Sequence, residues 1–276
     1  MDDSRSHTRR GPLKAVVLDW AGTTVDYGSF APTAVFIELF KRYQVEISPA
    51  HARAPMGLMK KDHLRAIAAL PEVAQRWRAV YGKPPQETDI DEMFAQFETM
   101  QIACLAQYSY LIPGVLDAIT AFRQMGLKIG STTGYTRSMM DVLLPEAVRQ
   151  GYMPDSLVCP TDVPAGRPYP WMMYQNAIQL GVYPMETMLK IGDSLVDIEE
   201  GINAGAWTIG LVKTGNLMGL TESEVLALPA SELAERKQNI IVRLLQAGAH
   251  YTADSLADCP PLVAEINQRL AKGERP

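Results

Sequence analysis

The stretch VVLDWAGTT, residues 16–24, decides the fold, because an apolar run ends there in a carboxylate that is followed by a turn. Residues 14–19 have the length and the Val-rich composition of a buried strand, and Asp19 stands at its carboxyl end. Glycine and two threonines follow, which places the acid in a tight loop rich in hydrogen-bond donors. Such a carboxylate can act as a nucleophile on phosphorus or as a magnesium ligand. Capping of the next helix is the structural alternative.

Further apolar runs with polar ends follow along the chain, and helical patterns separate them. The runs are residues 127–133, 156–159, 188–193 and 206–211, and the helical patterns are residues 114–125, 170–180 and 196–204. Strands that alternate with helices at this spacing are typical of a parallel sheet. We therefore predict an α/β fold with a Rossmann-like parallel-sheet core, whose ligand binds beyond the carboxyl ends of the strands.

One long interval lacks strand patterns. Between residues 26 and 107 the pattern is helical, in segments 33–43, 60–69, 72–80 and 90–106. This interval is too long for one crossover connection. We predict an inserted α-helical cap domain of residues 26–107 over an α/β core domain of residues 1–25 and 108–276. In the tail, a helix over 231–246 and a short strand over 249–252 are predicted.

Composition limits the function classes. The chain has 276 residues, 47% of them hydrophobic, which is enough for a packed core with a smaller module. A net charge of −5 gives no long-range attraction to nucleic acid or to an anionic membrane. Three widely spaced cysteines indicate neither a disulfide framework nor a structural zinc site. The polar start MDDSRSHTRR lacks a signal-peptide core, and no apolar run is long enough for a membrane span, so we expect a cytoplasmic protein that handles small molecules.

Three further motifs lie at predicted strand ends or in loops. Thr133 and Gly134 in GSTTGY offer a hydroxyl and backbone N–H groups for an anion, although an ordinary turn has the same composition. Arg167 in VPAGRPYP is held by prolines and suits a phosphate or phosphonate oxygen; a surface arginine is the alternative. Asp193 and Asp197 in IGDSLVD can converge on Mg²⁺, and helix capping is compatible with the same residues.

Taken in this order, the four motifs resemble those of the haloacid dehalogenase superfamily: a nucleophilic Asp, a Ser/Thr, a Lys/Arg and an acidic metal pair. One position departs from the pattern. Ala21 stands two residues after Asp19, where most phosphatases of the superfamily carry an Asp that acts as general acid. Without that acid an alkoxide leaves unprotonated, at a cost of about 10²–10⁴ in rate. Hydrolysis of a simple phosphate ester therefore fits the sequence poorly.

The predicted cap contains a second source of activation. In RAPMGLMKKDH, residues 53–63, Lys60 stands among Met and Leu side chains at the start of a helix. Burial in such surroundings disfavours the ammonium and leaves an amine that can attack a carbonyl. A solvated Lys–Lys pair on a helix surface is the alternative for Lys60 and Lys61.

A closer resemblance, from residue 14 through the helical tail, is to the phosphonoacetaldehyde hydrolase (phosphonatase) family. It is carried by DWAGTT (19–24), MGLMKKDH (56–63), GSTTGY (130–135) and DVPAGRPYPW (162–171). The resemblance implies an enzyme that cleaves the C–P bond of phosphonoacetaldehyde with water, giving acetaldehyde and phosphate. It also implies that Lys60, and not Lys61, forms a Schiff base with the aldehyde. An imine lets the carbon leave as an enamine, which needs no proton on oxygen, so the acid missing at Ala21 is no loss.

The roles that follow from this resemblance are expectations. Asp19 attacks phosphorus and forms an aspartyl phosphate, and cap closure, a homodimer and a place in 2-aminoethylphosphonate degradation are implied. Two other functions stay open: a phosphatase or phosphomutase of the same superfamily, which Ala21 disfavours, and a non-catalytic binder of a phosphate ligand, which leaves the motifs unexplained as a set. The remaining assignments are Mg²⁺ on Asp19, the Ala21 backbone carbonyl and Asp193, with support from Asp197; phosphoryl binding by Thr133, Gly134 and Arg167; pocket lining by Met56 and Tyr135; and proton shuttling by His63.

Overall fold

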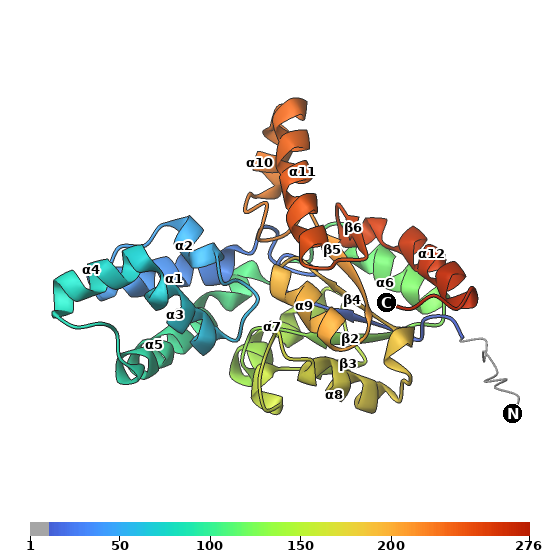
Figure 1. The fold of residues 1–276 in the computed structure, drawn as a ribbon, viewed down its shortest axis with the longest axis horizontal. Helices are drawn as coiled ribbons and strands as arrows, with labels where there is room; N and C mark the ends of the chain where they lie inside the picture. Colours follow the sequence, from blue (N-terminus) through green and yellow to red (C-terminus); the bar gives the residue numbers. More distant parts are fainter. Residues whose placement is uncertain (1–10) are drawn as a thin grey trace, which may run out of the picture.

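The computed structural model describes residues 11–276 and contains one six-stranded sheet (Figure 1). All neighbouring strands are parallel, in the order β3-β2-β1-β4-β5-β6. The strands are β1 (Ala15–Leu18), β2 (Lys128–Thr132), β3 (Ser156–Val158), β4 (Met188–Gly192), β5 (Trp207–Leu211) and β6 (Tyr251–Ala253).

The central strand β1 places Asp19 at the middle of the sheet's carboxyl edge. Its four residues are fully buried, and Val16 pairs with Ile129 on one side and Leu189 on the other. An apolar strand without alternation is what a sheet covered on both faces requires. Helices α6 and α12 pack together on one face, while α8 and α9 pack against strands of the same sheet. The bounds of the core helices are α6 (Val115–Gln124), α7 (Arg137–Arg149), α8 (Trp171–Leu180), α9 (Leu195–Asn203), α10 (Glu222–Ala227), α11 (Ala230–Gln246) and α12 (Pro260–Ala271).

Between β1 and α6 the described chain forms helices and no strand of the sheet. In Figure 1 these helices lie together to the left of the sheet. Their shared interior includes Phe36, Trp77 and Phe97, all nearly or fully buried, and the rings of Phe36 and Phe97 stack with centroids 4.3 Å apart. The helices are α1 (Phe30–Arg42), α2 (Pro49–Arg53), α3 (Lys60–Ala69), α4 (Pro71–Tyr81) and α5 (Glu87–Leu105).

The predicted fold class is confirmed: a parallel sheet is surrounded by helices, and a helical segment is inserted after the first strand. The domain limits, 1–25 with 108–276 and 26–107, stay a prediction. The polar segment 1–10, from which we expected no signal peptide, lies outside the described residues. Within residues 11–276, no helix is both long and apolar enough to cross a membrane.

Four helices were not predicted from the sequence: α2, α7, α10 and α12. The second of these contains Pro145 in its interior, and proline normally interrupts a helix. Helix α7 forms nevertheless, because Met139, Met140 and Leu143 are buried in the core. Tertiary packing thus outweighs the local signal at this point.

Candidate active site

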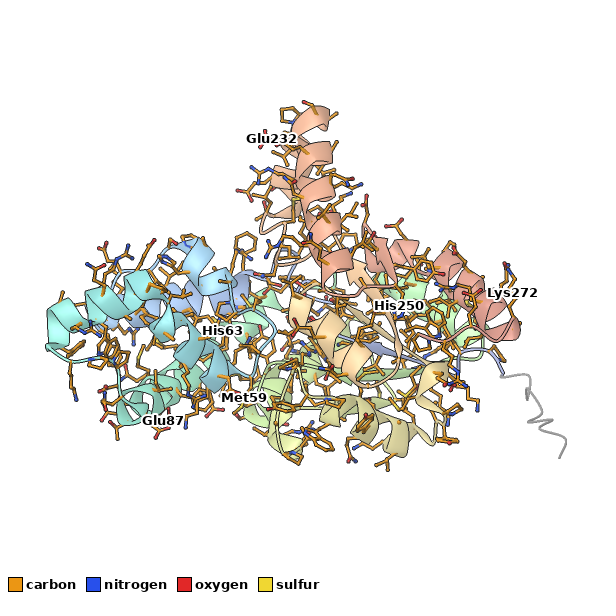
Figure 2. All side chains as sticks on the ribbon, in the orientation of Figure 1. Met59, His63, Glu87, Glu232, His250 and Lys272 are labelled. Atoms are coloured by element: carbon orange, nitrogen blue, oxygen red, sulfur yellow. The ribbon has the colours of Figure 1, made fainter. Side chains whose placement is uncertain are left out.

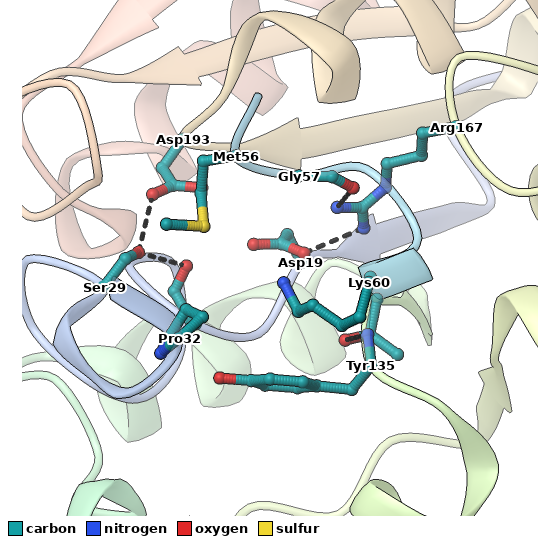
Figure 3. A pocket seen from close by; sticks show the side chains of 12 residues that line it. Asp19, Ser29, Pro32, Met56, Gly57, Lys60, Tyr135, Arg167 and Asp193 are labelled. Carbon is teal, nitrogen blue, oxygen red and sulfur yellow. Dashed lines mark hydrogen bonds and ion pairs between the residues drawn. The ribbon is translucent and has the colours of Figure 1, made fainter. Parts of the chain in front are cut away.

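The predicted site residues meet in one pocket at the carboxyl edge of the sheet (Figure 3). Asp19 follows β1, Thr133 and Gly134 follow β2, and Asp193 follows β4, while Lys60 enters from α3. Short loops at the ends of neighbouring parallel strands bring these side chains together. The lining is Asp19, Ala21, Ser29, Pro32, Met56, Gly57, Lys60, Thr133, Gly134, Tyr135, Arg167 and Asp193.

Three buried carboxylates form the acidic part of the site. Asp19, Asp193 and Asp197 each have a carboxylate oxygen within 4.8 Å of the others. Burial and the neighbouring carboxylates raise the pKa of Asp19 and raise that of Asp193 well above its ordinary value. Burial also works to raise the pKa of Asp197, but Arg167 and Lys190 outweigh it and hold this pKa below its usual value.

This donor set fits Mg²⁺, which prefers hard oxygen ligands and one or two carboxylates. The hydroxyl of Ser29 lies 2.9 Å from the Ala21 carbonyl oxygen and 3.2 Å from Asp193 Oδ2, so these two predicted ligands face the same point. A divalent cation there would offset the repulsion that raises the pKa values of Asp19 and Asp193. Asp19, Ala21 and Asp193 are the residues that would hold the ion.

Gly22, which follows Ala21 in the chain, allows the Asp193 carboxylate to lie close to the Ala21 carbonyl. Gly22 has φ +86°, and a Cβ there would lie 2.1 Å from Asp193 Oδ2 and 2.5 Å from the Ser29 hydroxyl. Both the backbone conformation and the space exclude a side chain. Steric exclusion therefore explains why glycine occupies position 22 in the DWAGTT motif.

Arg167 is buried and contacts carboxylates of the core directly. Its Nη2 lies 2.8 Å from Asp19 Oδ1, its Nη1 3.0 Å from Asp197 Oδ1, and its Nε 3.1 Å from Glu200 Oε2. The guanidinium therefore fixes one oxygen of Asp19 and leaves the other facing the pocket. Asp197 does not line the pocket, and it also accepts hydrogen bonds from Ser194.

Sequence reasoning missed a second buried cation beneath the site. Lys190 lies within β4, with Nζ 2.9 Å from Asp197 Oδ1, 3.3 Å from Glu200 Oε2 and 2.8 Å from Thr132 Oγ1. Two signals could have indicated it. Lys190 is the one charge in the apolar strand MLKIG, and Glu200 lies three residues after Asp197 on α9, hence on the same helix face. Ser29 and Pro32, which line the pocket, carried no such signal.

Lys60 is the first residue of α3 and is 4% exposed. Burial lowers its pKa to about 8, against the opposing effect of Asp19. In Figure 3 the side chain extends toward Asp19, yet among residues 11–276 no carboxylate lies within ion-pair distance of Nζ. Lys61 points elsewhere: it pairs with Asp91 and lies 3.4 Å from Glu87, which Figure 2 labels among the inserted helices.

His63 lies among the cap helices and does not line the pocket (Figure 2). Its Nε2 is 2.8 Å from the Ala52 carbonyl oxygen, and its ring lies against Phe36 with centroids 4.0 Å apart. Burial and the charge of Lys60 lower the pKa of His63 well below its usual value. The imidazole is therefore neutral near pH 7, and its Nδ1 has no partner among the described residues.

The comparisons with known proteins agree with this fold. The family model of the haloacid dehalogenase-like hydrolases matches residues 13–205, and the chain belongs to that class of enzymes. A protein named phosphonoacetaldehyde hydrolase-like protein from Syntrophobacter fumaroxidans is 55% identical, with 99% of each chain covered. A phosphonoacetaldehyde hydrolase from the same organism is 52% identical, covering 99% of this chain and 98% of the relative.

Among solved structures, the phosphonoacetaldehyde hydrolase-like protein from Oleispira antarctica superposes with a TM-score of 0.95 at 41% identity, over 96% of each chain. Within the haloacid dehalogenase-like hydrolases, the chain belongs to the phosphonoacetaldehyde hydrolase family. The predicted family and the prediction of a hydrolytic enzyme are thereby confirmed.

Proposed function

We propose that the protein hydrolyses phosphonoacetaldehyde to acetaldehyde and phosphate through an imine on Lys60 and an aspartyl phosphate on Asp19. The observation that carries the proposal is a buried amine with a pKa of about 8 in the same pocket as a strand-end carboxylate. The names of relatives at about 50% identity support the substrate. Domains 1–25 with 108–276 and 26–107 then correspond to a core that holds Asp19 and a cap that supplies Lys60.

The first half of the mechanism takes place on the carbon. The neutral Lys60 amine adds to the aldehyde, water leaves, and a protonated imine forms. As the C–P bond breaks, its electron pair moves into the imine and gives an enamine. Protonation of the enamine carbon and addition of water then release acetaldehyde and free Lys60. Ala21 suits this route, because the departing group carries no alkoxide that needs a proton.

The second half takes place on phosphorus. The Asp19 oxygen that does not contact Arg167 attacks phosphorus as the C–P bond breaks. Water then hydrolyses the aspartyl phosphate, so one water is consumed in the net reaction. Thr133, Gly134 and Arg167 are assigned to the phosphoryl oxygens, and Met56 and Tyr135 to the aldehyde end. When bound, Mg²⁺ would neutralise charge on the phosphoryl group and on the acids that hold it.

His63 is better assigned to positioning than to proton transfer. Its neutral ring, its contact with Phe36 and its place outside the pocket lining support a role in holding α3. A proton shuttle between His63 and Lys60 remains the alternative assignment, because the two residues stand one helical turn apart.

Trapping of the imine tests the proposed function. The protein is incubated with phosphonoacetaldehyde and borohydride, and the modified peptide is mapped by mass spectrometry. The adduct is expected on Lys60 and is expected to be lost in Lys60→Arg, while the neighbouring variant Lys61→Arg retains both adduct and turnover. Normal turnover in Lys60→Arg would exclude the imine route. Asp19→Asn is expected to form the imine without releasing phosphate, and phosphate release by this variant would remove Asp19 as nucleophile.

We also propose a cytoplasmic homodimer that acts in 2-aminoethylphosphonate degradation. The apolar exposed side chains Tyr169, Trp171 and Ile178, on and just before α8, support self-association. Sedimentation equilibrium is expected to give a dimer for the wild type and a monomer for Ile178→Asp.

A further inference from the structure

A guanidinium from the cap is bound to a loop of the core. Arg53 ends α2, and its Nη1 donates to the Gly28 carbonyl oxygen at 2.6 Å and to Asn216 Oδ1 at 3.0 Å. Asn216 Nδ2 donates in return to the Arg53 carbonyl oxygen at 3.1 Å. Arg53 and Asn216 therefore hold each other reciprocally, one from each side of the boundary between cap and core.

The same asparagine contacts the acidic cluster through its main chain. The backbone N–H of Asn216 donates to Asp193 Oδ2 at 2.6 Å, the shortest hydrogen bond that this carboxylate accepts from a described residue. Asn216 is 4% exposed, so this contact is shielded from water. One residue thus binds the cap with its side chain and the predicted Mg²⁺ ligand with its backbone.

The loop around Asn216 fits closely against Arg53. A Cβ at Gly219 would lie 3.2 Å from the Nε and Cζ atoms of Arg53, so the loop lies against the guanidinium. On another side, the guanidinium carbon lies 4.9 Å from the centre of the Phe30 ring, where α1 begins. Phe30, the Gly28 carbonyl just before α1 and the core loop therefore all contact one side chain.

The chemistry of these contacts suits a connection that forms and breaks. Among the described residues, the hydrogen-bond acceptors of Arg53 are neutral carbonyl and amide oxygens. These bonds lack the second charge of an ion pair, and water can replace each acceptor when the cap lifts. A buried ion pair would instead oppose opening at every turnover.

We propose that Arg53 and Asn216 are positioning residues that couple the seating of the cap to the orientation of Asp193. With the cap seated, the Arg53–Asn216 pair fixes the loop, and the Asn216 N–H holds the Asp193 carboxylate toward Ser29 and the Ala21 carbonyl. With the cap lifted, the loop loses its partner and the carboxylate its fixed direction. The inference rests on the proposed role of Asp193 in Mg²⁺ binding, and it deepens the proposed function by linking that role to the cap.

Mg²⁺ affinity without substrate tests the coupling. Isothermal titration with Mg²⁺ is carried out on the wild type, Arg53→Gln, Asn216→Ala and the double variant, after circular dichroism has confirmed their folding. Each single variant is expected to bind Mg²⁺ about tenfold more weakly, within the usual range of coupling energies. The double variant is expected to be no weaker than either single one, because both remove the same pair. Asn216→Ala is the more informative single variant. It removes the side chain that contacts Arg53 and keeps the backbone N–H that contacts Asp193.

Two controls separate coupling from general damage. Arg65→Gln removes another cap arginine, one that pairs with Asp62 and Glu87 on the cap surface, and wild-type Mg²⁺ affinity is expected. Arg53→Lys keeps the charge without the planar fork, and an intermediate affinity is expected. Arg53→Lys also replaces Arg53→Gln in the titration if the latter variant does not fold.

Unchanged Mg²⁺ affinity in Asn216→Ala and Arg53→Lys, additive losses in the double variant, or no Mg²⁺ binding by the wild type would each overturn the proposal. The titration contains no phosphonoacetaldehyde, so its result is independent of whether the wild type hydrolyses that substrate. A wild type that does not hydrolyse phosphonoacetaldehyde, together with a tenfold loss of Mg²⁺ affinity in Asn216→Ala, therefore contradicts the proposed function alone. A wild type that hydrolyses it, together with unchanged Mg²⁺ affinity in Asn216→Ala, contradicts the coupling alone.

Discussion

Lys60 Nζ lies 4.9 Å from the centre of the Tyr135 ring, so a side chain from the inserted helices meets one from the turn after β2. The aromatic face attracts the ammonium form, whereas burial favours the neutral amine. Burial is the largest effect and Asp19 opposes it, which leaves the pKa of Lys60 at about 8, well below the ordinary 10.5. The amine is therefore partly available for attack on a carbonyl near neutral pH.

This pKa predicts the pH dependence of imine formation. A lowered amine pKa means that the ammonium form predominates below pH 8, where it cannot attack, and that the neutral amine predominates above it. The rate of imine formation at low substrate concentration is expected to rise about tenfold per pH unit below this value and to level off above it. Rapid-quench trapping with borohydride across the pH range gives the apparent pKa, and a value near 10.5 would contradict the burial of Lys60.

Removal of the buried cation in β4 is expected to destabilise the fold strongly. Lys190→Met leaves Asp197 and Glu200 without one of their two positive partners, and breaking a buried pair costs about 3–5 kcal/mol. Urea unfolding measures the change in free energy. Lys237→Met is the matched control, because the pair between Lys237 and Asp254 is partly exposed and surface pairs contribute about 0–1 kcal/mol. Equal losses in the two variants would contradict the structural role of Lys190.

Gly22 is expected to be required for the metal site. Gly22→Ala introduces a Cβ at 2.1 Å from Asp193 Oδ2 in a backbone conformation with φ +86°, so the carboxylate must move. We expect Mg²⁺ binding to fall below detection by isothermal titration. Gly126→Ala tests strain alone, because its φ is +80° and nothing lies within 4 Å of the added methyl group. If Gly126→Ala loses Mg²⁺ binding equally, the steric argument fails.

His63 is expected to stay uncharged across the physiological range. Burial lowers its pKa well below 6.5, so its ring carbons should show no NMR titration where an exposed histidine titrates. A positioning role further predicts that a variant which loses the contact with Phe36, such as His63→Ala, loses stability by about 0.5–3 kcal/mol. A titration near pH 6.5 would restore the assignment of His63 as a proton shuttle.

Local patterns predicted the fold and the pocket because both depend on strand ends. An apolar run that stops at Asp19, and a second that stops at Asp193, must bring both acids to one edge if the strands are parallel neighbours. The apolar residues around Lys60 made it a candidate, but the resemblance to the phosphonoacetaldehyde hydrolase family is what favoured it over a solvated lysine. Helix α7 was not predicted, because Pro145 contradicts the local helix signal and only the core packing restores it.

Contacts between distant segments could not be predicted. Arg53 and Asn216 are 163 positions apart, and neither of them was assigned a role from the sequence. The same holds for Ser29, whose hydroxyl lies between the Ala21 carbonyl and Asp193 only because the chain turns back at Asp26 and Ser29, both with positive φ. Such contacts depend on the position of the cap relative to the core, and the spacing of motifs in the sequence does not predict that position.

Mg²⁺ is expected to stabilise the fold by relieving repulsion among the buried acids. A ligand that binds only the folded state stabilises it by about 2.7 kcal/mol at one hundred times its dissociation constant. The melting temperature is therefore expected to rise on addition of Mg²⁺ and to fall in EDTA. Asp193→Asn should reverse the order: it removes one of the repelling charges, so it melts above the wild type in EDTA, but it gains little from Mg²⁺ because a ligand is lost. Differential scanning calorimetry of the wild type and Asp193→Asn, each with Mg²⁺ and with EDTA, measures these melting temperatures. If Asp193 does not bind the ion, Mg²⁺ will raise the melting temperature of both proteins by the same amount.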